Sequence, residues 1–147
     1  MYVAAAKRLT HEGARKIVAV AMEQAHAAKI SISCCVVDSG GHVIALDRMD
    51  GAQYHTVHSC TTKAACCSST KRKTSTKGAV GQDLDVIHAI GLTLAAGIER
   101  WTAMEGGVPV WIDGECVGGV GVSGGDWVTD QRIAEAAVAA IGAKGER

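Results

Sequence analysis

Residues 113–125 read DGECVGGVGVSGG, and six of these thirteen residues are glycine. So much glycine is typical of a flexible linker. Val117, Val120 and Val122 nevertheless keep the spacing of a β-strand, and the stretch ends in Ser-Gly-Gly just before an expected helix. We therefore interpret it as a strand that was built around glycine for a structural or functional reason.

The segment before this strand supports that interpretation. VPVWI (108–112) is an apolar run rich in β-branched residues, and the Asp113-Gly114 pair suits the type I′ turn of a tight hairpin. Gly118, Gly119 and Gly121 then remove side chains where a helix, a second subunit or a ligand must lie close to the backbone.

Hydrophobic periodicity and turn residues divide the rest of the chain. Thr10 is a candidate N-cap, the motif DSGG (38–41) separates two strand-like runs, and Val86, Ile90 and Leu94 align in the third helix. The expected order is α-β-β-α-α-β-β-α, an α+β fold with an antiparallel sheet of about four to five strands sandwiched by helices, as a single domain over 1–147. The expected helices are 10–29, 55–70, 83–101 and 127–142, and the other strands are 30–37 and 42–49.

Composition excludes several classes of protein. The chain has 147 residues, 48% of them hydrophobic, and its fifteen basic and fifteen acidic residues cancel. No global field would attract nucleic acid or an anionic membrane, and no apolar run is long enough to span a bilayer. The N-terminus lacks the apolar core of a secretory signal, so we expect a cytoplasmic protein whose six cysteines are reduced, packed thiols.

The turn into the last helix is a candidate anion site. Ser123, Gly124 and Gly125 precede a helix start, where free N–H groups and the positive end of the helix dipole favour a carboxylate or phosphate. The alternative is that the glycines only make a sharp turn and that Asp126 or Thr129 caps the helix.

Three histidines are candidates for acid–base or metal chemistry. His55 and His58 are three residues apart, so on a helix they share one face, and His88 lies in the third helix beside Asp85. Together, and with Cys60 or Glu105, they could hold a divalent metal. The alternative is that His55 and His58 are solvated residues at a helix start and that His88 is hydrogen-bonded and partly buried.

Three motifs resemble those of the GlcG/HbpS family of haem-binding-like proteins, which also includes the C-terminal domain of PduO-type corrinoid adenosyltransferases. They are LTHEGARKIVAVAMEQA (9–25), VVDSGGHVIALDRMDGA (36–52) and GGVPVWIDGECVGGVGVSGG (106–125). The similarity extends from about Leu9 to Ile141. It implies a compact, usually oligomeric α/β sandwich around an antiparallel sheet, with haem as the ligand of some members. Lys63, on the family's Lys-Ala pair, is then expected to neutralise a carboxylate or haem propionate, or to pair with an acid such as Asp50.

Two functions follow from these expectations. The first is a homo-oligomeric binding module for haem, another tetrapyrrole or a small anionic ligand, with His55 or His58 as an axial ligand. The second is a small metal-assisted or cofactorless enzyme acting on a carboxylate or carbonyl compound. In that enzyme the glycine-rich amides and Lys63 hold the anion, and His55, His58 or His88 moves protons. We favour the first because it needs no chemistry that the sequence fails to show.

Overall fold

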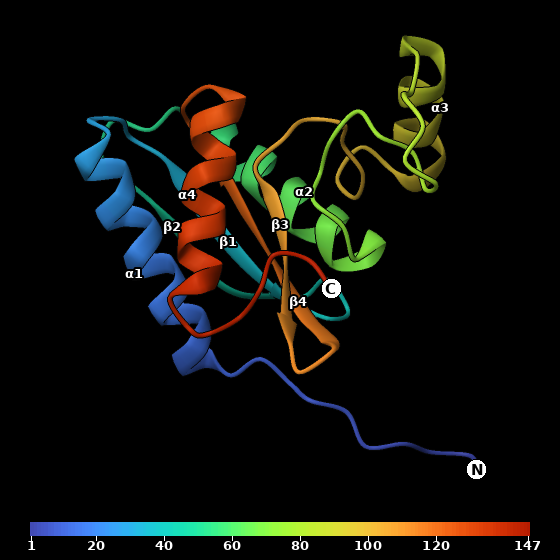
Figure 1. Ribbon diagram of the computed structural model, residues 1–147. Helices are drawn as coiled ribbons and strands as arrows, with labels where there is room; N and C mark the ends of the chain where they lie inside the picture. Colours follow the sequence, from blue (N-terminus) through green and yellow to red (C-terminus); the bar gives the residue numbers. More distant parts are fainter.

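The computed structural model describes all 147 residues, Met1–Arg147, and confirms the expected order of elements (Figure 1). The helices are α1 (His11–Ala27), α2 (His55–Thr70), α3 (Val86–Ala96) and α4 (Trp127–Ala139). The strands are β1 (Ser33–Asp38), β2 (Val43–Arg48), β3 (Gly107–Ile112) and β4 (Glu115–Ser123).

The four strands form one antiparallel sheet in the order β2-β1-β4-β3, which confirms the α+β class. The two hairpins supply β1–β2 and β3–β4, and the central pairing of β1 with β4 joins the two halves of the chain. Helices α1 and α4 cover one face of the sheet and α2 covers the other, so the architecture is a three-layer sandwich (Figure 1).

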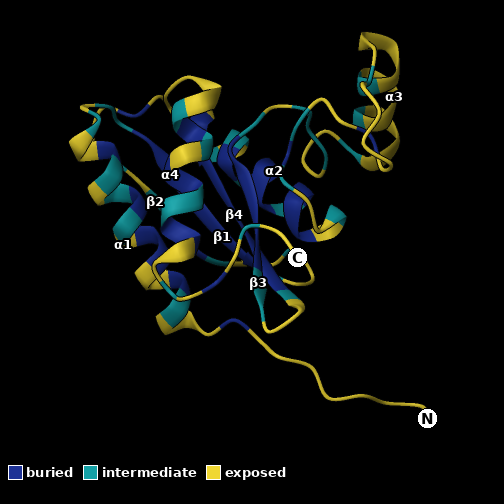
Figure 2. Ribbon diagram, viewed as in Figure 1, coloured by how far each residue is buried: buried dark blue, intermediate teal, exposed yellow.

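The larger core lies between the sheet and the pair α1 and α4, where the ribbon is dark blue in Figure 2. The side chain of Thr10 accepts a hydrogen bond from the amide of Gly13 at 3.1 Å, which confirms it as the N-cap of α1. The face of α1 predicted from periodicity is buried in this core: Ala14, Ile17, Val18, Ala21 and Ala25.

Both hairpins turn as their sequences predict. Asp113 and Gly114 have φ angles of 47° and 80°, as a type I′ turn requires. In the first hairpin the Asp38 carboxylate accepts hydrogen bonds from the amides of Gly40 and His42 at 2.8 and 3.0 Å.

The glycines of β4 explain the unusual composition of that strand. A Cβ on Gly121 would lie 1.9 Å from the carbonyl oxygen of Cys60, and one on Gly119 would lie 2.5 Å from that of Ala64. Both carbonyls belong to α2. The sequence left open whether these glycines make room for a helix, a second subunit or a ligand. At Gly119 and Gly121 the close neighbour is the helix α2.

Helix α3 departs from expectation. It is shorter than 83–101, it contains no buried residue, and it packs extensively against no other helix or strand. It stands apart from the sandwich in Figure 1 and is largely yellow in Figure 2. The periodicity of Val86, Ile90 and Leu94 correctly indicated a helix, but periodicity shows which side chains share a face and not what covers that face.

No helix combines the length and apolar character that crossing a membrane would require.

Candidate functional site

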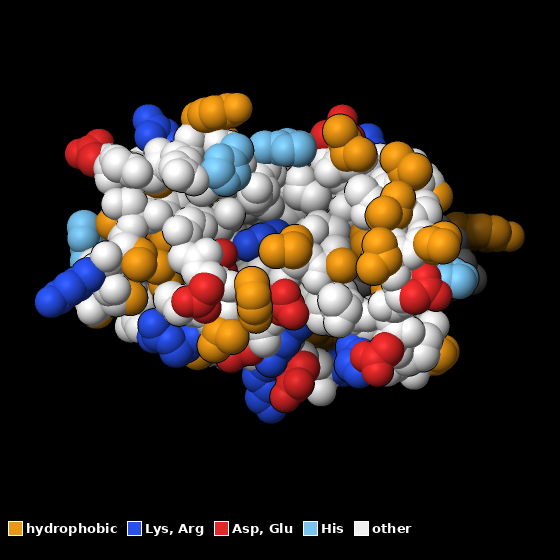
Figure 3. Space-filling view, turned by 90° about the horizontal axis from the view of Figure 1, so that it is seen from above, with side chains coloured by type: hydrophobic (Ala, Val, Ile, Leu, Met, Phe, Trp, Pro, Cys, Tyr) orange, Lys and Arg blue, Asp and Glu red, His pale blue; other side chains and the backbone are white.

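A cavity of about 470 Å³ lies where the start of α2, the end of β4 and the start of α4 meet. Thr93 of α3, Ile98 and residues of the segment 101–104 also line it. In the view from above, histidine side chains lie beside this hollow (Figure 3). The cavity brings together five residues singled out from the sequence: His55, His58, Lys63, Ser123 and Gly125.

The first two turns of α2 place both histidines at the cavity. His55 and His58 are exposed and line it together with Thr62, so one helical face runs from the exposed histidines to a buried residue. The ring of Tyr54 meets that of His55 edge-on, with centroids 6.1 Å apart. The two imidazoles are therefore available from one face to a ligand that enters the cavity.

Lys63 lies deeper and is 5% exposed. Its ammonium donates to the carbonyl oxygen of Val122 at 2.8 Å and to the Asp130 carboxylate at 3.2 Å. This buried ion pair ties α2 to α4 beside the end of β4. Lys63 is thus paired with an acid, as one of the two expectations held, but the acid is Asp130 and not Asp50.

The start of α4 does not offer the free amides that the sequence suggested. The Asp126 side chain accepts from the amide of Thr129 at 2.9 Å, and the Asp130 carboxylate accepts from the amide of Gly125 at 2.8 Å. The carboxylates of Asp126 and Asp130 therefore bind the amides that were expected to bind an anionic ligand, and they complement the helix dipole. The capping alternative with Asp126 is the correct one.

Gly124 also has a different role from the expected one. A Cβ at this position would lie 2.4 Å from the carbonyl oxygen of Ser31, and Gly124 does not line the cavity. It allows the turn after β4 to pass close to the segment before β1. Ser123, by contrast, does line the cavity and is 8% exposed.

The remaining wall has four apolar side chains, beside the polar Ser59, Thr93 and Thr102. The apolar ones are Ile98, Trp101, Met104 and Trp127. The cavity also contains Thr62, whose buried hydroxyl has no hydrogen-bond partner in the protein. The cavity thus combines an apolar wall, two imidazoles and a polar floor in which Lys63 is already neutralised.

His88 is outside this site. Its ring nitrogen lies 2.8 Å from the Asp85 carboxylate at the start of α3, and its side chain is 74% exposed. Hydrogen bonds from the backbone N–H and then the ring of His88 hold the pKa of Asp85 below its usual value. The predicted convergence of three histidines is therefore wrong, because α3 stands away from α2.

The structure also gives no support to a metal centre or a reactive thiol. It contains no group of three or more His, Cys, Asp and Glu side chains placed to hold a metal ion. Burial raises the pKa of Cys60 to about 12 and that of Cys35 to about 11. These thiols stay protonated and packed, which agrees with the expectation of reduced core cysteines.

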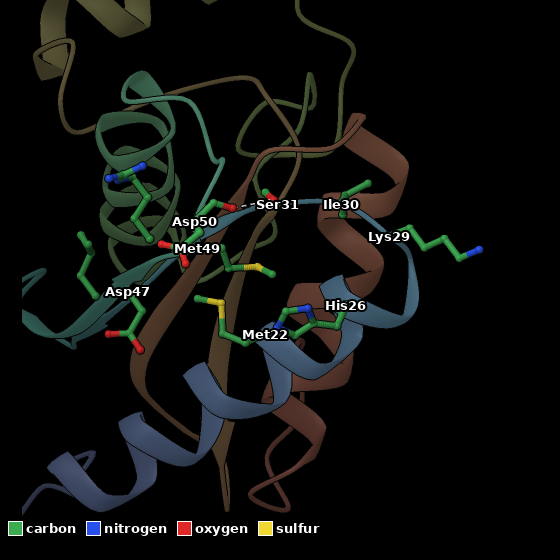
Figure 4. A pocket seen from close by; sticks show the side chains of 10 residues that line it. Met22, His26, Lys29, Ile30, Ser31, Asp47, Met49 and Asp50 are labelled. Atoms are coloured by element: carbon green, nitrogen blue, oxygen red, sulfur yellow. Dashed lines mark hydrogen bonds between the residues drawn. The ribbon is translucent and has the colours of Figure 1, made fainter.

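A second hollow, of about 660 Å³, lies between α1 and the end of β2 (Figure 4). Met22 and His26 reach it from α1, and Met49 and Asp50 from the segment after β2. The sulfur of Met49 already accepts the amide of Ile32 at 3.4 Å. None of the residues predicted to be functional lines this hollow, so the cavity beside α2 is the better candidate.

Sequence reasoning missed several residues of the site. Asp130 is separated from Lys63 by 67 residues, so no local pattern could reveal the pair. Trp101, Met104 and Trp127 come from separate segments, so no local pattern indicates that they line one cavity. The sequence did contain one indication. Asp126 and Asp130 lie at the start of the helix, where acidic side chains often accept hydrogen bonds from its free amides.

Comparisons with known proteins agree with this fold. The model of the family described as haem degrading protein HbpS-like matches residues 9–139. Protein GlcG of Escherichia coli K12 is 35% identical over 116 residues, which are 78% of this chain and 81% of GlcG.

Solved structures give the same result. A crystal structure of a PduOC–haem complex superposes with a TM-score of 0.83 at 25% identity, covering 96% of this chain and 100% of the other. A doubly substituted HbpS of Streptomyces reticuli superposes with a TM-score of 0.75 at 28% identity, covering 93% and 89%. The fold, the motifs and the length of these matches together show that the chain belongs to the HbpS-like family, as a relative of GlcG.

Proposed function

We propose that this chain binds haem or a related tetrapyrrole in the cavity beside α2. The observation that carries the proposal is the pairing of two exposed imidazoles, His55 and His58, with an apolar wall in one cavity. Neither feature alone points to a tetrapyrrole, but an axial ligand beside an apolar surface is what haem proteins provide.

The residues present fit such a ligand. Imidazole nitrogen is a common ligand of iron, and His55 or His58 would supply it. Trp101, Met104 and Trp127 offer flat or adaptable apolar surface to a macrocycle. The volume of about 470 Å³ lies within the range of small-molecule sites. Haem, when bound, would supply the redox chemistry of its iron, and these side chains would bind and orient it.

The charges at the floor disfavour a small inorganic anion as the ligand. Asp126 and Asp130 are both carboxylates of the lining, and Lys63 is the only lysine or arginine there. An anion placed among them would meet more negative than positive charge. Haem avoids this conflict, because its propionates can remain in water while the apolar ring enters the cavity.

The relatives support the same ligand. The PduOC structure is a haem complex, and the family description names haem degradation, which begins with haem binding. The enzyme alternative lacks comparable support. The groups expected to hold its anionic substrate, Lys63 and the amide of Gly125, are both already paired with the Asp130 carboxylate.

Titration of the purified protein with hemin tests the proposal. A saturable Soret band is expected, and His55→Ala or His58→Ala should shift that band and weaken binding by at least about tenfold, the loss typical even for residues that only support a metal ligand. His11→Ala, at the exposed start of α1, is the matched control and should bind as the parent does. Diffuse, non-saturable binding, or identical spectra for all variants, would refute the proposal.

A further inference from the structure

One buried hydroxyl of α2 has no hydrogen-bond partner in the protein. The hydroxyls of Ser59, Thr61 and Thr70 donate to carbonyl oxygens one turn earlier in the helix. Thr62 is 5% exposed, and its hydroxyl bonds neither to the helix nor to any other group. A buried polar group without a partner destabilises the folded chain, so native proteins contain few of them and each needs an explanation.

The position of Thr62 supplies that explanation. It lines the cavity beside α2, one helical turn beyond the exposed His58 and on the same face. Four residues span about 6 Å along a helix axis, so the imidazole lies at the mouth of the cavity and Thr62 lies deeper. Ser123 lines the same cavity from the end of β4 and is 8% exposed. It comes two residues after Gly121 in the strand, so it faces α2 as Gly121 does. The floor therefore carries two nearly buried hydroxyl side chains.

The charged groups of the floor, in contrast, are already paired. Lys63 donates to the Asp130 carboxylate at 3.2 Å, and the Asp126 carboxylate accepts from the amide of Thr129 at 2.9 Å. Hydrogen bonds from the backbone N–H and then the side chain of Thr129 hold the pKa of Asp126 below its usual value. The group that the floor leaves unsatisfied is thus an uncharged hydroxyl. It matches an uncharged group of a ligand that can accept or donate a hydrogen bond.

We propose that the cavity also binds open-chain tetrapyrroles and that the Thr62 hydroxyl recognises them. The inference rests on the proposed function, in which the propionates remain in water and the opposite edge of the ligand enters the cavity. In haem that edge carries only methyl and vinyl groups, which cannot pair with a hydroxyl. When the ring is open at that edge, two lactam rings lie there instead, and each offers a carbonyl oxygen and an N–H. A lactam on the floor gives Thr62 the partner that it lacks, with Ser123 as a second hydroxyl nearby.

A comparison of hemin with biliverdin IXα tests the inference, because both carry two propionates and only biliverdin has lactam ends. Thr62→Val removes the hydroxyl and keeps the shape of the side chain. The dissociation constant of this variant for biliverdin, measured by absorbance titration, should rise about fivefold, the loss of one net hydrogen bond. Its dissociation constant for hemin should change by less than about twofold.

Two further measurements separate recognition of a ligand from a structural role. The midpoint of urea unfolding of Thr62→Val should equal or exceed that of the parent, because the substitution breaks no hydrogen bond within the chain. Thr61→Val is the matched control. The Thr61 hydroxyl donates to the carbonyl oxygen of Val57 and does not line the cavity, so this variant should bind both ligands as the parent does.

A Thr62→Val variant that keeps the affinity of the parent for both ligands, or loses affinity for both equally, would overturn the inference. So would a lowered midpoint of unfolding, because the hydroxyl would then have a partner inside the folded chain. A parent that binds hemin but not biliverdin refutes the inference and leaves the proposed function standing, whereas a parent that binds neither ligand refutes both.

Discussion

Helices α2 and α3 contradict the usual relation between hydrophobicity and burial. Helix α2, HTVHSCTTKAACCSST, is rich in serine and threonine, yet half of its residues are buried, among them Thr62, Lys63 and Ser68. Helix α3, VIHAIGLTLAA, is almost wholly apolar and has no buried residue. The more polar helix lies against the sheet, and the more apolar one stands in solvent (Figure 2).

Most polar groups of α2 are compatible with its position because they have hydrogen-bond partners, inside the helix or outside it. The Ser68 hydroxyl, for example, donates to the carbonyl oxygen of Asp38 at 2.8 Å, and the unpartnered Thr62 hydroxyl is the exception. The hydroxyls of Ser59, Thr61 and Thr70 donate to carbonyl oxygens one turn earlier, at 3.1, 2.8 and 2.9 Å. Such side chains are short, so the helix backbone can approach Gly119 and Gly121 of β4. Close approach and satisfied hydrogen bonds therefore matter more for α2 than the apolar character of its residues.

The largest effect on stability is expected from a substitution of Lys63, the buried charge of α2. Lys63→Met would leave the Asp130 carboxylate buried without its cation, at a cost of about 3–5 kcal/mol in the free energy of unfolding. Urea unfolding followed by circular dichroism measures this loss. Lys16→Met, on the exposed side of α1, is the control and should stay within about 0.5 kcal/mol of the parent. Equal stability of the two variants would show that the pair does not hold α2 to α4.

The next comparison is the change in stability when a glycine that faces α2 and a glycine within α3 are each replaced by alanine. Gly121→Ala would place a Cβ 1.9 Å from the backbone oxygen of Cys60, so α2 must move, at a cost of about 3 kcal/mol. Gly91→Ala in α3 meets no atom within 4 Å and should stabilise the helix by up to about 1 kcal/mol. Thermal unfolding of both variants measures the contrast. Effects of the same sign would contradict the packing described for the two helices.

These two predictions also show what the sequence could reveal. The hairpin at Asp113-Gly114 and the buried face of α1 depend on neighbours in the chain, so turn chemistry and periodicity predicted them correctly. The same methods predicted the existence of α2 and α3 but not which of them would be buried. That depends on the close approach of β4, which Gly121 signals only as one of several alternatives.

In the candidate site, too, features that depend on local sequence were predicted and features that depend on the tertiary fold were not. His55 and His58 were predicted to share a face because helical spacing is local. The partner of Lys63 was not predicted, because Asp130 becomes its neighbour only through the pairing of β1 with β4 and the turn that follows. The prediction of an anion site at Gly125 was wrong because it considered the free backbone amides but not the nearby carboxylates. The Asp130 carboxylate already accepts a hydrogen bond from the Gly125 amide.

The buried thiols give a smaller effect that depends on pH. An unfolded thiol ionises near pH 8.5, whereas burial raises the pKa of Cys60 to about 12. Between these values the unfolded chain loses a proton that the folded chain keeps, so the free energy of unfolding is largest below about pH 8.5 and falls as pH rises. Cys60→Ala should reduce that slope by up to about 1.4 kcal/mol per pH unit in urea unfolding under reducing conditions. An unchanged slope would show that the Cys60 thiol is not protected.

The smallest effect is expected at His88. His88→Ala removes an exposed side chain that contacts Asp85 and not the cavity, so hemin affinity and the Soret band should remain those of the parent. Exposed pairs of this kind contribute roughly 1 kcal/mol or less to stability. A spectral change as large as that of His55→Ala would mean that α3 folds back toward α2 in solution.

Hydrogen–deuterium exchange with and without hemin tests most directly whether the cavity beside α2 is the ligand site. We predict new protection in the backbone amides of residues 55–63, 101–104 and 123–130, which surround the cavity. The hollow between α1 and β2, at residues 22–31 and 46–50, should be unaffected (Figure 4). Protection confined to that second hollow, with the amides of α2 unchanged, would contradict the account.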